Sequence, residues 1–207
     1  MLSLETLTLF FVASVGLALS PGPDNVFVLA QSALNGRKAG LLVTLGLCTG
    51  LLLHSAAVAF GVATVIKNMD YGFLVIKLFG ATYLSYLALQ LLKAEAMTVE
   101  QTQTAVLPAR LYRRGIIMNI TNPKVAIFFL AFLPQFTHPE KGAMAVQLLT
   151  LGGIFIVATA LVFGSIAWFS GFLRERLFNS KAAQNVLNRT TAVLFVGLAV
   201  NLLLTDL

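Results

Sequence analysis

The stretch Ser20-Pro21-Gly22-Pro23-Asp24-Asn25 interrupts an apolar run that otherwise extends over residues 7–34. Its two prolines remove backbone donors and clash with the preceding turn of a helix, and the glycine between them permits unusual backbone angles. A broken helix in hydrocarbon needs protein or water around its freed backbone groups, and a carboxylate there is costly unless it has a function. The sequence therefore predicts a broken membrane helix with functional residues at the break.

The composition is that of a membrane protein. Of 207 residues, 58% are hydrophobic and 11% are charged, whereas a soluble domain has about 25% charged residues. The net charge is +6, but the basic residues lie in short clusters between apolar segments. This pattern is typical of membrane orientation rather than of a phosphate-binding face. The expected surroundings are a lipid bilayer, and nucleic-acid binding is not expected.

Segments of roughly 20 apolar residues mark membrane helices, and the chain has six of them. They cover residues 4–34 with the break, 39–66, 72–93, 113–133, 144–172 and 186–205. The longest polar connection, residues 94–112, is the natural midpoint, and no segment is left for a soluble domain. We therefore predict an all-α integral membrane protein with a single transmembrane domain over residues 1–207.

The basic residues predict the orientation of these spans. Most of them fall in or beside the connections after the first, third and fifth spans: Arg37, Lys38, Lys93, Arg110, Arg113, Arg114, Arg174, Arg176, Lys181 and Arg189. Loops rich in Lys and Arg stay in the cytoplasm. Both termini are therefore expected outside the cytoplasm, with the reverse orientation as the alternative.

The two halves of the chain resemble each other weakly. With an offset of 100 residues, Pro23 aligns with Pro123, and each is followed by a charged residue and an apolar stretch with phenylalanine. Three spans per half is an odd number, so the halves must enter the membrane in opposite senses. This predicts two inverted three-helix repeats, at about residues 1–100 and 110–207, with helices one and four broken. Chance similarity is the alternative.

Several stretches together carry a resemblance to a known family. They are SPGPDNVFVL (20–29), GRKAGL (36–41) with GLCTGLLLH (46–54), KLFGATYLSYLALQLL (77–92) and GIIMNITNPKVAIFFLAFLPQF (115–136). In this order and spacing, they resemble the homoserine and threonine resistance family of bacterial amino-acid exporters, within the lysine exporter superfamily. The resemblance runs nearly end to end, and its most specific motifs are PGP in the first span and NPK in the fourth.

The resemblance implies a secondary transporter that exports amino acids or close derivatives across the bacterial cytoplasmic (inner) membrane by proton antiport. Members are credited with threonine, homoserine and its lactone, leucine or basic amino acids, so the substrate is not fixed. An exporter of cations or other small solutes, or a passive channel, is the alternative. No GxSxG, HExxH or P-loop motif occurs, so neither an enzyme nor an ATP-driven pump is expected. The oligomeric state stays open, with a homo-oligomer as one alternative.

Asp24 and Lys124, one after each aligned proline, are the first candidates for substrate binding and coupling. An amino acid is a zwitterion, so its headgroup needs an acceptor for the ammonium and a donor for the carboxylate. These two side chains supply both. A structural ion pair is the alternative, and the two interpretations are compatible because a pair that opens for substrate or proton acts as a gate.

The backbone at each break supplies further candidate groups. Carbonyls near residues 17–19 lose their helical partners and are expected to be available to a ligand. Pro23 suits the first turn of the following half-helix, whose exposed amides and positive dipole end suit a substrate carboxylate. Asn122 before Pro123 offers the same arrangement in the second half. A packing kink relieved by neighbouring hydroxyls is the alternative.

Other polar side chains complete the candidate site. Asn25, Asn119 and Asn122 are candidate headgroup partners, with helix capping as the alternative. His54 in the second span is a candidate proton relay, with an interhelical hydrogen bond as the alternative. His138 is expected in a loop, and no cysteine or carboxylate cluster lies near either histidine in the sequence, so neither a metal site nor a cofactor is expected.

Overall fold

The computed structural model describes residues 2–68, 72–94, 107–173 and 180–204. These residues are almost entirely helical, and no strand occurs among them, which confirms the expected all-α class. The elements are, in order, α1 (Leu4–Leu19), α2 (Pro23–Asn35), α3 (Arg37–Asn68), α4 (Gly72–Lys93), α5 (Pro108–Thr121), α6 (Pro123–Ala131), the 3-10 helices η1 (Leu133–Phe136) and η2 (Pro139–Lys141), α7 (Met144–Trp168), α8 (Ser170–Leu173) and α9 (Lys181–Leu204).

Two helices are long and apolar enough to cross a membrane on their own. They are α3, over residues Arg37–Gly61, and α7. Two helix pairs meet the same criteria together: α1 with α2, and α5 with the helix that continues through η1 to Phe136. The described residues thus contain two to four candidate spans. Helices α4 and α9 lie where the remaining two spans are expected.

The first helix break follows from its sequence. Helix α1 ends at Leu19, and Pro23 is the first residue of α2, where a missing backbone N–H breaks no helical hydrogen bond. Gly22 between them is fully extended, with φ −172° and ψ 176°. The axes of α1 and α2 consequently differ by 65°.

The second break has the same arrangement, with an extended residue before a proline that begins the next helix. Helix α5 ends at Thr121, Asn122 is extended with φ −76° and ψ 107°, and Pro123 is the first residue of α6. The axes of the two helices differ by 54°. Helix α5 begins at Pro108, ahead of the span expected at residues 113–133, because Pro108 suits the first turn of a helix.

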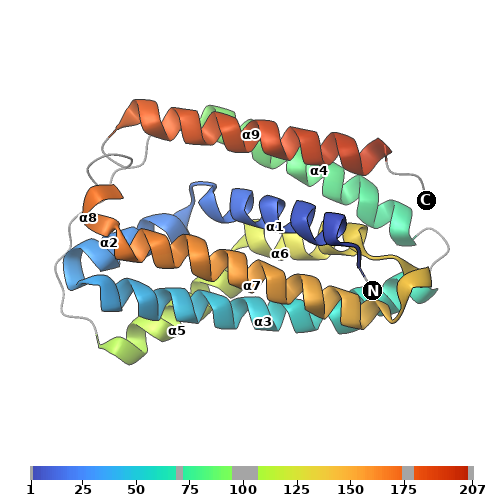
Figure 1. Ribbon diagram of the computed structural model, residues 1–207, viewed down its shortest axis with the longest axis horizontal. Coiled ribbons are helices and arrows are strands. Elements are labelled where there is room, and N and C mark those ends of the chain that lie inside the picture. Colours follow the sequence, from blue (N-terminus) through green and yellow to red (C-terminus); the bar gives the residue numbers. More distant parts are fainter. Residues whose placement is uncertain (1, 69–71, 95–106, 174–179, 205–207) are drawn as a thin grey trace.

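The helices form a bundle whose arrangement is visible in Figure 1. Helices α4 and α9 pack together along one side, and α3 and α5 pack together along the other, with α7 against α3 and α1 against α7. Helix α1 begins and α9 ends at the same end of the bundle, whereas α3 and α5 begin at the opposite end. The basic residues Arg37 and Arg110 therefore lie at the end opposite to the start of α1.

Aromatic side chains and glycines bring the helices of the bundle into close contact. The ring centroid of Phe10, in α1, lies 6.4 Å from that of Phe132, which stacks on it, and 5.1 Å from that of Phe136, which meets it edge-on.

Helices α3 and α5 come into close contact at two glycines. A Cβ on Gly46 would overlap the backbone carbonyl oxygen of Tyr112, and a Cβ on Gly115 would overlap the backbone of α3.

Candidate functional site

The two helix breaks are joined by a hydrogen bond between Asn122 and Asp24. Asn122 Nδ2 donates to Asp24 Oδ2 at 2.8 Å, across 98 positions of sequence. Both residues are buried. Asn122 Oδ1 meanwhile accepts from the backbone N–H of Lys124 at 3.0 Å. Asn122 is therefore a helix cap and a partner of the Asp24 carboxylate at once, and its role as a headgroup partner stays a prediction.

Lys124, which follows the second break, bonds to the backbone of the first break. Its Nζ donates to the carbonyl oxygens of Ser20 at 3.0 Å and Leu17 at 3.4 Å. Asn25 Nδ2 donates to the Ala18 carbonyl at 2.8 Å. The expectation that carbonyls near residues 17–19 are available to a ligand is therefore wrong for this structure, because side chains have replaced their helical donors.

Asp24 and Lys124 do not form a direct ion pair. Lys124 Nζ instead contacts backbone carbonyl oxygens, and Asp24 Oδ2 instead accepts from an amide. The carboxylate is held by Asn122, and the ammonium is held by the carbonyls of the first break. The two charged groups thus have separate hydrogen-bond partners, and a direct ion pair does not account for their placement.

A small cavity lies between these groups. It encloses about 20 Å³, which is room for about one water molecule. Its lining combines four polar residues, Asp24, Asn119, Lys124 and Thr159, with the apolar residues Leu17, Ala18, Val125, Phe155 and Phe163. Asp24 Oδ1, Asn119 Oδ1 and Thr159 Oγ1 are buried without a hydrogen-bond partner. Buried polar atoms without partners are rare and call for a specific explanation, such as a bound ligand.

His54 of α3 reaches the second break. Its Nε2 lies 3.3 Å from the Asn119 carbonyl oxygen, which also accepts from the backbone N–H of Asn122 at 3.1 Å. Pro123 stands where the helical donor to this carbonyl would be, so His54 and Asn122 replace it. A carbonyl oxygen only accepts, so Nε2 carries the proton in this contact. The interhelical hydrogen bond is present, and a relay role stays a prediction.

The family is decided by comparison with known proteins. The profile of the LysE type translocators matches residues 15–206. The chain belongs to this family. The resemblance inferred from the PGP and NPK motifs is thereby confirmed.

Named relatives of this translocator are efflux proteins. The leucine efflux protein of Salmonella typhimurium is 31% identical over 204 residues, covering 93% of this chain and 92% of the relative. The homoserine/homoserine lactone efflux protein of the same organism is 34% identical over 157 residues, covering 74% of each chain. A search of solved structures finds no match.

One residue that borders the small cavity is not predicted from the sequence. Thr159 lies in the middle of α7, is 2% exposed and borders the cavity with Asp24 and Asn119. Its signal in the sequence is weak, because a threonine in an apolar helix usually bonds its own backbone and needs no other explanation. Thr150 on the same helix does so, with its hydroxyl on the Val146 carbonyl at 2.8 Å.

Proposed function

We propose that this translocator exports amino acids or close derivatives across the bacterial inner membrane, as a secondary transporter with proton antiport. The observation that carries the proposal is the cavity between the helix breaks. It offers an acid, a base and unpartnered oxygens, which are the groups that a zwitterionic headgroup requires. The names of the leucine and homoserine efflux relatives support this substrate class.

In the proposed site, each end of the zwitterion has its own partners. Asp24 Oδ1 and Asn119 Oδ1 accept from the substrate ammonium, since neither atom has another donor. Lys124 Nζ donates to the carboxylate. The N-terminus of α2 reinforces this binding, because Gly22 provides no side-chain cap for its amides.

The site is closed in this structure. A cavity of about 20 Å³ cannot hold an amino acid, so the first break must move away from α6 to admit one. Lys124 holds these segments together through the Ser20 carbonyl. We infer that a substrate carboxylate draws the ammonium away from this carbonyl, so that Lys124 acts as a gate as well as a ligand.

We further propose six spans arranged as two inverted repeats, with each bent pair as one broken span. The packing supports a twofold relation in which α1, α3 and α4 correspond to α5, α7 and α9. The corresponding helices α3 and α7 pack together, and so do α4 and α9. The contact of α1 with α7 corresponds to the contact of α5 with α3. The basic end of the bundle faces the cytoplasm, and both termini face away from it.

Export of cations has less support from the site. A metal-cation site needs several oxygen ligands, whereas Asp24 is faced by the amide donor of Asn122 and lies in one cavity with the Lys124 ammonium. Both groups repel a metal cation. An open channel also has less support, because the route between the breaks is filled by side chains.

Release of amino acids from overproducing cells tests the function. Cells that carry the wild-type protein should accumulate one or more amino acids in the medium, whereas Asp24→Asn, which removes the charge with little change in shape, should lower release at least tenfold at equal membrane abundance. Glu5→Gln, at the exposed start of α1, is the matched control and should be neutral. No release by the wild type, or normal release by Asp24→Asn, would contradict the proposal.

A reporter fusion tests the orientation separately. A reporter that is active only in the cytoplasm should stay inactive when it is joined after the last residue. Activity there would show the reverse orientation without bearing on the substrate.

A further inference from the structure

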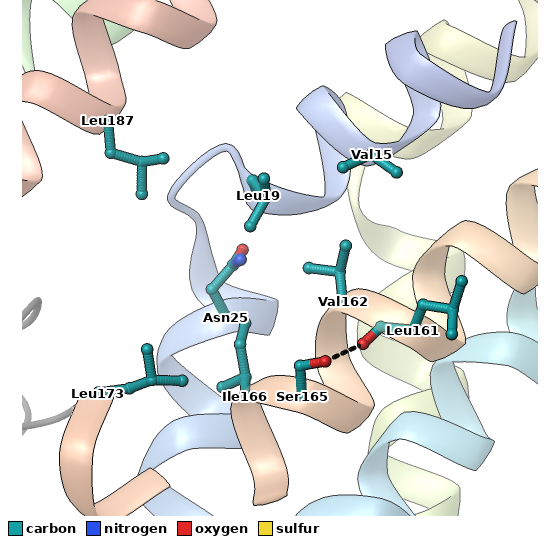
Figure 2. Close-up of a pocket in the computed structure, with 9 residues that line it drawn as sticks. All are labelled: Val15, Leu19, Asn25, Leu161, Val162, Ser165, Ile166, Leu173 and Leu187. Atoms are coloured by element: carbon teal, nitrogen blue, oxygen red, sulfur yellow. Dashed lines mark hydrogen bonds between the residues drawn. The ribbon is translucent and has the colours of Figure 1, made fainter. Parts of the chain in front are cut away.

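A larger cavity lies on the other side of the first break. It encloses about 330 Å³, at the lower end of the roughly 300–1,000 Å³ typical of small-molecule sites. Seven of its nine lining side chains are aliphatic and none is aromatic, so its walls suit a flexible aliphatic group. Figure 2 shows Leu187 of α9 across this aliphatic pocket from Val162 of α7, with Leu19 of α1 between them at the break.

One polar atom at the aliphatic pocket has no partner. Asn25 is 2% exposed, and its Nδ2 donates to the Ala18 carbonyl, but its Oδ1 has no hydrogen bond. The side chain points from the start of α2 toward Leu19 (Figure 2). Ser165, the other polar residue of the lining, bonds the carbonyl of Leu161 on its own helix. The Asn25 oxygen is therefore an acceptor at the pocket that no protein group satisfies.

The break connects this pocket with the charged groups of the proposed site. A Cβ on Gly22 would lie 3.3 Å from Lys124 Nζ and 3.8 Å from Asn25 Oδ1, so both atoms border the space beside this glycine. Residues 17 and 18 line the small polar cavity, whereas Leu19 lines the aliphatic pocket. A ligand at the break could thus reach the ammonium, the amide oxygen and the pocket.

We propose that the aliphatic pocket receives the side chain of the transported amino acid, and that Asn25 Oδ1 is an additional acceptor for its ammonium group. The substrate class is amino acids with an aliphatic side chain of about the size of leucine. This inference rests on the proposed export function. Charged and strongly polar side chains are disfavoured, because a buried polar group without a partner is costly.

A lipid acyl chain is the competing occupant. Leu161 at the rim is 56% exposed, so the pocket opens on the outer surface of the bundle. An acyl chain has no donor for the Asn25 oxygen, however, whereas an amino acid has an ammonium group. The unpartnered oxygen therefore favours the amino acid.

Counterflow in proteoliposomes tests the proposal, with labelled leucine and labelled alanine measured separately. Val162→Phe and Leu187→Phe fill the pocket from two different helices. Each should lower leucine transport about tenfold relative to alanine transport, the scale of discrimination that one methylene gives in an apolar pocket. Val157→Phe is the matched control, because Val157 is on α7 but is 54% exposed and outside the pocket lining. It should leave the ratio unchanged.

The outcomes separate this inference from the function on which it rests. If the wild type transports amino acids but neither pocket variant changes the leucine-to-alanine ratio, the inference is wrong and the export function stands. A phospholipid that copurifies with the wild type and is lost from both variants, with the ratio unchanged, identifies an acyl chain as the occupant and also overturns the inference. If the wild type transports no amino acid, both proposals fail.

Discussion

Asn122 Nδ2 donates a 2.8 Å hydrogen bond to Asp24 Oδ2, and this contact joins the residue at the second helix break to the first turn of the helix after the first break. The two residues are 98 positions apart. Asp24 follows Pro23, the first residue of α2, and Asn122 precedes Pro123, the first residue of α6. The bond supplies one donor to a buried carboxylate. The second carboxylate oxygen is buried without a partner, so the bond holds the acid in place and leaves one of its oxygens for the proposed ligand.

Loss of this donor should weaken both the fold and transport. Asn122→Leu keeps the approximate size of the side chain but leaves Asp24 Oδ2 without its donor, and a buried acceptor without a partner costs about 1–3 kcal/mol. We expect a lower melting temperature in detergent and at least tenfold lower efflux. Asn35→Leu is the control, because Asn35 bonds only Gln31 at the exposed end of α2. Equal melting temperatures for Asn122→Leu and wild type would contradict the structural role of the bond.

Replacement of Pro123 should distinguish a functional break from a simple helix start. Pro123→Ala restores a backbone N–H that can donate to the Asn119 carbonyl, which His54 now serves. Efflux should fall while membrane abundance stays the same, since a continuous helix would remove the break at which the proposed site is built. Pro108 also occupies the first turn of a helix but lies away from the cavity, so Pro108→Ala should leave efflux unchanged. Normal efflux by Pro123→Ala would assign this proline to packing alone.

The substitution Gly46→Ala should destabilise the contact between α3 and α5. The added Cβ would overlap the Tyr112 carbonyl oxygen, which is backbone and cannot move aside without shifting the helix. Overpacking of this kind costs typically about 1–3 kcal/mol. Gly153→Ala is the matched control, since Gly153 has open space around it and alanine favours a helix by roughly 0.5–1 kcal/mol over glycine. The two variants should shift the melting temperature in opposite directions, and a shared direction would contradict the close packing.

Much of this architecture could be predicted from sequence because it rests on local rules. Proline removes a helical donor and clashes with the preceding turn, and both breaks lie directly before Pro23 and Pro123, the first residues of α2 and α6. The partners at the breaks could not be predicted in the same way. Whether Lys124 meets Asp24 or the Ser20 carbonyl depends on the relative position of two helix pairs, and that position is set by packing over the whole bundle.

The role of His54 can be tested with two substitutions of different chemistry. His54→Gln keeps a donor for the Asn119 carbonyl but cannot titrate, whereas His54→Leu removes the donor. If the contact is structural, His54→Gln should retain at least half of the wild-type efflux driven by an imposed pH gradient, and His54→Leu should lose more. If both variants lose pH-driven efflux but retain counterflow, His54 relays protons instead.

Lys124 offers the sharpest test, because its two proposed tasks need different properties. Holding the Leu17 and Ser20 carbonyls needs a donor, whereas binding a substrate carboxylate needs a positive charge. Lys124→Met lacks both, so membrane abundance and efflux should fall together. Lys124→Gln keeps donors without the charge, so abundance should return toward the wild-type level while efflux stays at least tenfold low. Lys38→Met, at the exposed start of α3, is the control and should be neutral.

The two readouts separate the tasks of Lys124. Normal efflux by Lys124→Gln would show that the positive charge has no part in substrate binding, and the headgroup assignment would be wrong. Normal abundance of Lys124→Met would show that the freed carbonyls at the first break do not depend on this side chain. The expected pattern, abundance restored and transport not restored by the amide, requires that the same ammonium group both closes the break and binds the substrate.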